Sequence, residues 1–182
     1  MNNSEHFAQL TTTLQNGGIA VVRTDTLYGI IALASNEQAV EKVFAAKHRD
    51  RTKQCIVLIP DAAAVPEYQS VIAKFSSPEQ PTSIVVPATN EPAWLLRGGN
   101  TIAYRVVANE FLKSVVEAVG PVIAPSANPE GQPPAQTIDE AHTYFSDEVD
   151  CYIDGGQVPS TVQASRIIEV GTNGEIITHR DR

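Results

Sequence analysis

Short apolar runs alternate with longer helical segments along the whole chain, and this alternation limits the possible folds more than any other feature. Strands are predicted at 19–22, 28–34, 55–59, 83–86, 101–107, 122–124, 149–153, 165–170 and 176–178. Interleaved strands and helices favour an α/β or α+β class with a mixed sheet. Asn173-Gly174, between the last two runs, is typical of a hairpin turn. This turn predicts an antiparallel pair and argues against a purely parallel sheet.

Helices are predicted between these runs, at 4–16, 35–47, 66–75, 109–119 and 137–145. The clearest is 109–119, where Asn109 can cap the start and the apolar side chains recur on one side. The stretch 90–100, which holds the single tryptophan Trp94, is predicted to be a polar, Gly-containing excursion. The stretch 160–162 is predicted to open a strand.

Length and charge narrow the function classes. The chain has 182 residues, and one domain spanning 1–182 is expected. Hydrophobic residues make up 42% and charged residues 19%, which is ordinary for a globular protein. The formal net charge of -8 argues against tight nucleic-acid binding over the whole surface, because such binding neutralises phosphates with Lys and Arg. A local basic face, and weak RNA binding by it, stays possible.

The two cysteines and the apolar runs point to a cytoplasmic protein. Cys55 and Cys151 lie far apart, without metal-ligand spacing or a disulfide framework. No secretory signal pattern opens the chain, and no apolar run approaches the roughly 20 residues that cross a bilayer. We therefore expect no membrane association.

The stretch from Thr24 to Lys53 places hydroxyl groups and cations one supersecondary unit apart. Thr24-Asp25-Thr26 follows an apolar run, and Lys47-His48-Arg49 ends the next predicted helix. Lysine offers a point charge and arginine a fork for phosphate or carboxylate, so a site for a small anion is one interpretation. A self-bonded β-turn and a solvated, dipole-complementing helix end are the alternatives.

Two later loops carry similar chemistry. Pro125-Ser126-Ala127-Asn128 follows a predicted strand, at the kind of strand end where open α/β sheets bind ligands. Ser160-Thr161 follows a Gly-Gly loop and is either an anion-binding turn or a strand entry. The chain has no GxxxxGK[ST], GxGxxG, GxSxG or HExxH motif and no plausible catalytic triad. Positioning and charge neutralisation therefore fit better than acid–base or covalent catalysis.

Taken in order, the motifs resemble a known family. They are TDTLYG, KHR, Pro81-Thr82, TIAYRV, PSAN, DGG and STV, between about residues 17 and 170. This order is similar to that of the YrdC-like threonylcarbamoyl-AMP synthase family. The resemblance implies a YrdC/RibB-type α/β fold, in which a twisted mixed β-sheet flanked by helices surrounds a concave cavity.

The resemblance also implies an activity. The enzyme would be a nucleotidyltransferase that joins L-threonine, bicarbonate and ATP into threonylcarbamoyl-AMP and releases pyrophosphate, with Mg²⁺ on the phosphates. Partner proteins would pass the group on to tRNA. The alternative is an RNA- or nucleotide-binding paralogue of the same fold without robust synthase activity.

The resemblance assigns roles to matching positions. Lys47 and Arg49 would be catalytic and would also hold the nucleotide, Thr26, Tyr28 and Arg105 would hold threonine and bicarbonate, and the remaining nucleotide contacts would come from Thr82, Ser126, Asn128 and Ser160. No residue is expected to ligate a metal. Three positions depart from the family pattern, and their effect is left open: Arg23, Asn109 and Glu130.

Overall fold

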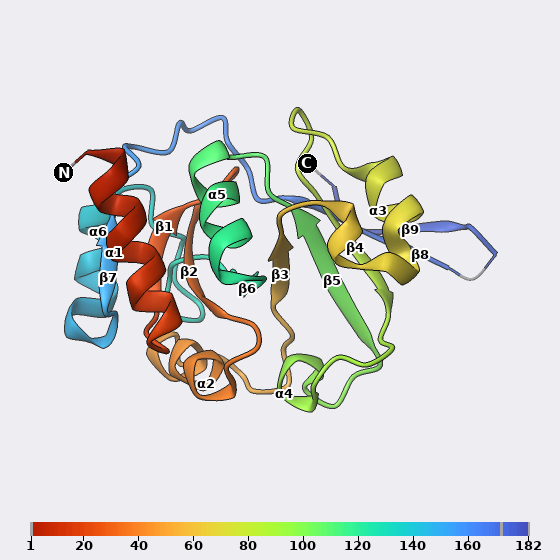
Figure 1. Cartoon of the computed structure of the whole chain (residues 1–182), viewed down its shortest axis with the longest axis horizontal. Coiled ribbons are helices and arrows are strands. Elements are labelled where there is room, and N and C mark those ends of the chain that lie inside the picture. The colour runs from red at the N-terminus through yellow and green to blue at the C-terminus, as the bar shows by residue number, and fades with distance from the viewer. Residues whose placement is uncertain (1, 172, 182) are drawn as a thin grey trace.

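Nine strands form one sheet in the computed structural model, which describes residues 2–171 and 173–181 (Figure 1). The strands are β1 (Ala20–Arg23), β2 (Tyr28–Leu33), β3 (Ile56–Ile59), β4 (Thr82–Pro87), β5 (Thr101–Val106), β6 (Val122–Ile123), β7 (Cys151–Ile153), β8 (Arg166–Val170) and β9 (Ile176–Arg180). Their order is β7-β1-β2-β6-β3-β5-β4-β8-β9. The β1–β7, β3–β5 and β4–β8 pairs are parallel and the other pairs are antiparallel, so the predicted mixed α/β sheet is confirmed.

Helices lie against the sheet. They are α1 (Asn3–Gln15), α2 (Glu37–Ala46), α3 (Gln69–Phe75), α4 (Ala93–Leu96), α5 (Glu110–Val119) and α6 (Ile138–Phe145), with 3₁₀ turns at Ala62–Ala64, Pro66–Tyr68 and Ser146–Glu148. Side-chain caps begin the longer helices: Asn36 accepts from the Ala39 amide and Asn109 from the Leu112 amide. The predicted helix at 109–119 is therefore present as α5, and Asn109 caps its start as predicted.

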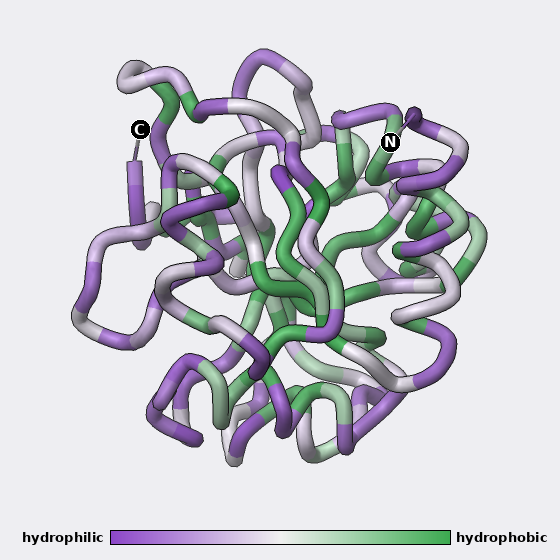
Figure 2. Tube along the Cα trace, turned by 90° about the vertical axis from the view of Figure 1, so that its left-hand side faces the viewer, coloured by the Kyte–Doolittle hydropathy of each residue, from purple (hydrophilic) through white to green (hydrophobic). Residues whose placement is uncertain are grey.

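Two hydrophobic cores form because neighbouring strand residues point to opposite faces. Ile31 and Leu58 join the core under α1 and α5, whereas Ile30 and Val57 join the core that includes Val43 of α2. In Figure 1, α1 and α5 stand side by side on one face of the sheet. Figure 2 shows apolar residues along the central strands and hydrophilic residues in the outer loops.

The structure adds a short helix to the predicted excursion at 90–100 and has a turn where a strand entry was predicted at 160–162. The stretch 90–100 contains α4, and Trp94 Nε1 of this helix donates to Ala34 O at 3.0 Å, which ties the excursion to the body of the protein. The stretch 160–162 is a turn, closed by the bond from Val162 N to Pro159 O, and the strand β8 begins only at Arg166.

Candidate functional site

A cavity of about 300 Å³ opens where β2, β3, β5 and the loop after β6 meet. Three guanidinium groups line it, those of Arg49, Arg105 and Arg180, and none of the described residues around it is an aspartate or a glutamate. The hydroxyl-bearing residues Thr26 and Ser126 line the same space. A lining that contains three cations and no carboxylate suits an anionic ligand.

At the end of α2 the side chains of Lys47 and Arg49 point in different directions. His48 takes a φ of 48°, in the left-handed region, and the chain turns there by a Schellman motif. The motif is complete, since His48 N donates to Ala45 O and Arg49 N donates to Phe44 O, both at 3.0 Å. After this turn Arg49 reaches the cavity, where its Nη2 donates to Gln54 O at 2.8 Å.

Lys47 lies beneath the cavity wall, although the resemblance names it as a catalytic residue. Only 2% of its surface is exposed, and its Nζ donates to the main-chain carbonyls of Ser126 and Asn128. Burial, followed by repulsion from Arg49, lowers the pKa of Lys47 to about 8. The side chain thus binds the Ser126–Asn128 loop rather than the open space.

The loop after β6 is fixed from several sides. Ser126 pairs with Gly29 in an isolated bridge, and Ala127 N donates to Tyr28 O at 2.8 Å. Ser126 Oγ donates to Asn128 Oδ1 at 2.6 Å, and Asn128 Nδ2 donates to the carbonyls of Pro129 and Gln132. Ser126 therefore faces the cavity, while Asn128 holds the loop's shape from within.

The Thr24–Thr26 turn forms another wall. Thr24 Oγ1 donates to Leu27 O at 2.8 Å and lies 3.3 Å from Thr26 Oγ1, as in a self-bonded turn. Tyr28 OH donates to Gly156 O at 2.8 Å, and burial raises the pKa of this tyrosine. The turn alternative and the ligand interpretation are therefore compatible: Thr24 closes the turn, and Thr26 is left beside the cavity.

Two of the residues that the resemblance names lie away from this cavity. Thr82 is buried, donates to Gln80 O, and lines a separate hollow beside Val106. Ser160 is exposed in the turn before β8. Because successive residues of a strand face opposite sides, the side chain of the next residue, Ser83, points the other way, and its Oγ lies 3.0 Å from Oγ of Ser165, which lines the cavity.

Arg180 is the site residue that the sequence did not reveal. It comes from β9, and it donates to Ser165 from Nε, at 2.7 Å to the carbonyl, and from Nη2, at 3.2 Å to the hydroxyl. Its position in an exposed terminal strand gave no signal in the sequence. The pairing of β8 with β9 brings it to the wall, so register rather than motif identifies it.

Each of the three residues that depart from the family pattern has identifiable contacts in the structure. Arg23 Nη1 donates to Gly155 O and Gln157 O, which fastens the DGG loop to the end of β1. Asn109 caps α5. Glu130 is not among the residues that line the cavity; it pairs with Lys53 and accepts from Asp50 N.

The described residues contain neither a cluster of metal ligands nor a helix that could span a membrane. Within residues 2–171 and 173–181, no group of three or more His, Cys, Asp and Glu side chains is arranged to hold a metal ion. In the same part of the chain, no helix combines the length and apolar character needed to cross a bilayer. Cys55 and Cys151 are both free thiols, and both are buried.

Comparison with known proteins identifies the family. A family model for Sua5, YciO and YrdC proteins, described as telomere recombination, matches residues 12–181. The chain belongs to this family. A relative from Pseudoalteromonas translucida, named threonylcarbamoyl-AMP synthase, is 29% identical over 177 residues, which are 90% of this chain and 95% of the relative.

Solved structures of family members have the same fold. P. abyssi Sua5, solved with L-threonine, matches with a TM-score of 0.86 at 26% identity over 99% of this chain. The match covers 54% of that protein, so the chain spans about half of its length. E. coli YciO matches with a TM-score of 0.82 at 18% identity, covering 99% of this chain and 90% of YciO. The predicted YrdC-type fold is thus confirmed.

Proposed function

We propose that this member of the family is an L-threonylcarbamoyladenylate synthase, which forms threonylcarbamoyl-AMP and pyrophosphate from L-threonine, bicarbonate and ATP. The name of the P. translucida relative and the threonine in the P. abyssi structure support the substrates. The observation that carries the proposal is the cavity itself, with three arginines and no carboxylate among the described residues that line it. All three substrates carry negative charge, and crowding them needs fixed cations.

The proposed role of each residue follows from whether it lines the cavity. Arg49 and Arg105 would bind the carboxylate and phosphate groups, and Thr26 and Ser126 would donate or accept hydrogen bonds beside them. Tyr28 would help to hold threonine through its ring and main chain, since its hydroxyl is bonded to Gly156. Lys47 and Asn128 would act through the loop that they fix, and Thr82 and Ser160 would contribute only if the nucleotide extends beyond this cavity.

The reaction would proceed by positioning rather than by acid–base catalysis. The amino group of threonine and bicarbonate would condense to a carbamate with loss of water. A carbamate oxygen would then form a bond to the α-phosphorus of ATP as the bond from that phosphorus to the β-phosphate bridging oxygen breaks, so pyrophosphate leaves. The arginines would hold the two anions within reach of each other, which lowers the barrier by removing the entropy of encounter.

Magnesium would accompany the nucleotide. The described residues form no acidic cluster for a resident ion, whereas Mg²⁺ is often held by substrate phosphates with few protein ligands. The ion would supply charge neutralisation on the phosphates. We further propose that partner proteins transfer the threonylcarbamoyl group to tRNA in the cytoplasm.

The test is a pyrophosphate-release assay with ATP, bicarbonate and each amino acid in turn. We expect release that depends on L-threonine, with L-serine as the closest comparison. Folded protein that releases no pyrophosphate with any amino acid would contradict the synthase. Tight, salt-dependent RNA binding without turnover would instead support the paralogue alternative.

A further inference from the structure

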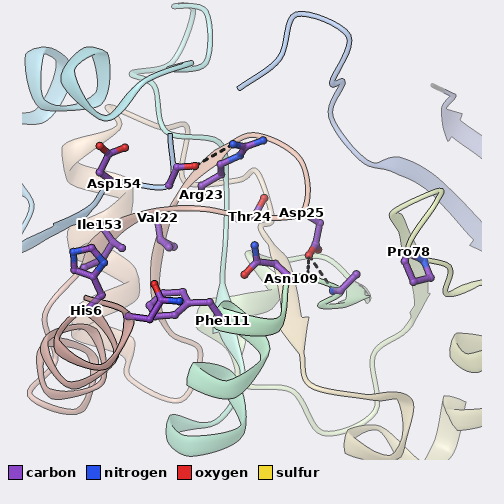
Figure 3. A pocket seen from close by; sticks show the side chains of 13 residues that line it. His6, Val22, Arg23, Thr24, Asp25, Pro78, Asn109, Phe111, Ile153 and Asp154 are labelled. Carbon is purple, nitrogen blue, oxygen red and sulfur yellow. Dashed lines mark hydrogen bonds between the residues drawn. The ribbon is translucent and has the colours of Figure 1, made fainter. Parts of the chain in front are cut away.

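Asp25, the middle residue of the Thr24–Thr26 turn, lies between two cavities. Figure 3 shows the neighbouring cavity, of about 480 Å³, with Asp25 and Asn109 at its wall. Thr24 lines both cavities, so the turn is the partition between them. The Asp25 side chain is only 3% exposed, and a carboxylate so deeply buried needs partners.

Each carboxylate oxygen of Asp25 faces a different partner. Oδ1 accepts from the main-chain amides of Ala108 and Asn109, at 2.9 and 2.5 Å, which the dashed lines in Figure 3 mark. Oδ2 lies 3.6 Å from Nε of Arg105, whose side chain is 5% exposed. The two hydrogen bonds from main-chain amides hold the carboxylate in place. The carboxylate then faces the guanidinium of Arg105, a residue that lines the candidate active site.

We infer that Asp25 is a positioning residue that orients the guanidinium of Arg105 toward the anionic substrate. This inference rests on the proposed function for the identity of that substrate. The guanidinium is a planar fork whose hydrogen bonds to carboxylate or phosphate depend on its orientation. Asp25 lies on the Nε side of the fork as an ion-pair partner, and the same arginine lines the cavity.

A purely structural role is the competing explanation. Asp25 could serve only to hold the turn against residues 108 and 109, through the two hydrogen bonds that it accepts from their main-chain amides. Asp25→Asn separates the two roles, because an amide oxygen still accepts hydrogen bonds while the negative charge is lost. A double-mutant cycle with Arg105→Gln then measures whether the two side chains act together.

We expect Asp25→Asn to lower kcat/KM for pyrophosphate release about 100-fold, as for a misplaced binding group. In the Arg105→Gln background, the same change should alter kcat/KM by no more than about 2-fold. Asp150→Asn is the matched control, since Asp150 also accepts a main-chain amide, that of Ile19 at 2.8 Å, far from the cavity. Additive effects in the cycle would overturn the inference.

A second measurement, by NMR, tests whether Asp25 positions the Arg105 guanidinium and does not depend on enzyme activity. The Nε–H resonance of Arg105, identified by its loss in Arg105→Gln, should be protected from solvent exchange in the wild type and lose that protection in Asp25→Asn. An unchanged resonance would overturn the inference even if the enzyme is active. A wild type without pyrophosphate release would contradict the proposed function alone, and this resonance would still decide the role of Asp25.

If Asp25→Asn does not fold, Asp25→Glu replaces it in both measurements. The longer side chain keeps the charge and the acceptor oxygens but displaces them by one methylene. We expect a melting temperature within a few degrees of the wild type and a fall in kcat/KM of about 10-fold or more. A folded Asp25→Glu protein with unchanged kcat/KM would overturn the inference.

Discussion

The ammonium group of Lys47 donates to the main-chain carbonyl of Ser126, so the lysine that the family motif marks as catalytic holds the loop that presents a cavity hydroxyl. The side chain is buried and also reaches the carbonyl of Asn128. Its effect on the reaction therefore passes through the shape of this loop in the ligand-free protein.

Lys47→Met should reduce both stability and activity. The substitution keeps much of the buried volume but leaves two buried carbonyls without their donor, at a cost of about 2 kcal/mol in the free energy of unfolding. Pyrophosphate release should fall by at least 10-fold because the loop loses its anchor. Chemical denaturation and the release assay measure the two effects. Lys53→Met is the control, since the exposed Lys53–Glu130 pair should matter little to either. Wild-type stability in Lys47→Met would show that the loop is held by other bonds.

The pKa of Lys47 predicts an unusual dependence of stability on pH. The pKa is lowered by burial from its ordinary value of 10.5 to about 8 in the folded chain. Between these two values the unfolded chain binds more protons than the folded chain, so the free energy of unfolding should rise with pH, by at most about 1.4 kcal/mol per pH unit. Denaturation of the wild type and of Lys47→Met from pH 7 to pH 10 isolates this contribution. Parallel curves for the two proteins would show that Lys47 titrates normally.

His48→Gly should stabilise the protein without loss of activity. His48 has a φ of 48°, where a side chain costs about 1 kcal/mol that glycine avoids. The turn itself would stay, since its hydrogen bonds come from the main chain. Thermal unfolding should show a higher midpoint, while His48→Ala, which retains a Cβ, should not gain this stability. A lower midpoint in His48→Gly would indicate that the imidazole contributes a contact of its own.

Arg180→Gln should weaken nucleotide binding more than threonine binding. The guanidinium lines the cavity through its bonds to Ser165, and loss of one charge-assisted contact to a phosphate raises Kd for ATP about 10-fold to 100-fold. Calorimetry with ATP and with L-threonine compares the two ligands. Arg166→Gln is the matched control from β8, because Arg166 pairs with Asp181 outside the cavity. Equal losses in both variants would point to net charge rather than a specific contact.

The sequence was enough to predict the strands and most helices, because apolar runs of strand length stand between capped helical segments. Ser126 and Arg49, proposed from local chemistry as loop and helix-end residues, both line the cavity. The position of Thr82 depends instead on distant pairing. It lines a separate hollow, and only the pairing of β4 with β5 and β8 places it there.

Burial within the basic cluster could not be predicted from local sequence either. The alternative of a solvated helix end fits Arg51, which is exposed and pairs with Glu41, whereas Lys47 is enclosed. No periodicity distinguishes the two, since the turn at His48 changes the direction of the chain between them. Arg180 could not be predicted for a related reason: an exposed terminal strand contributes to the cavity only through its partner β8.

The order of the strands also has a consequence for synthesis on the ribosome. β1 pairs with β7, and the partners Ala20 and Cys151 are separated by most of the chain. Arg180 is made after every other residue that lines the cavity. Contacts between such distant segments form slowly, and the site cannot be complete before residue 180 has been added. A nascent chain that lacks β9 therefore cannot bind its anionic substrates with all three arginines.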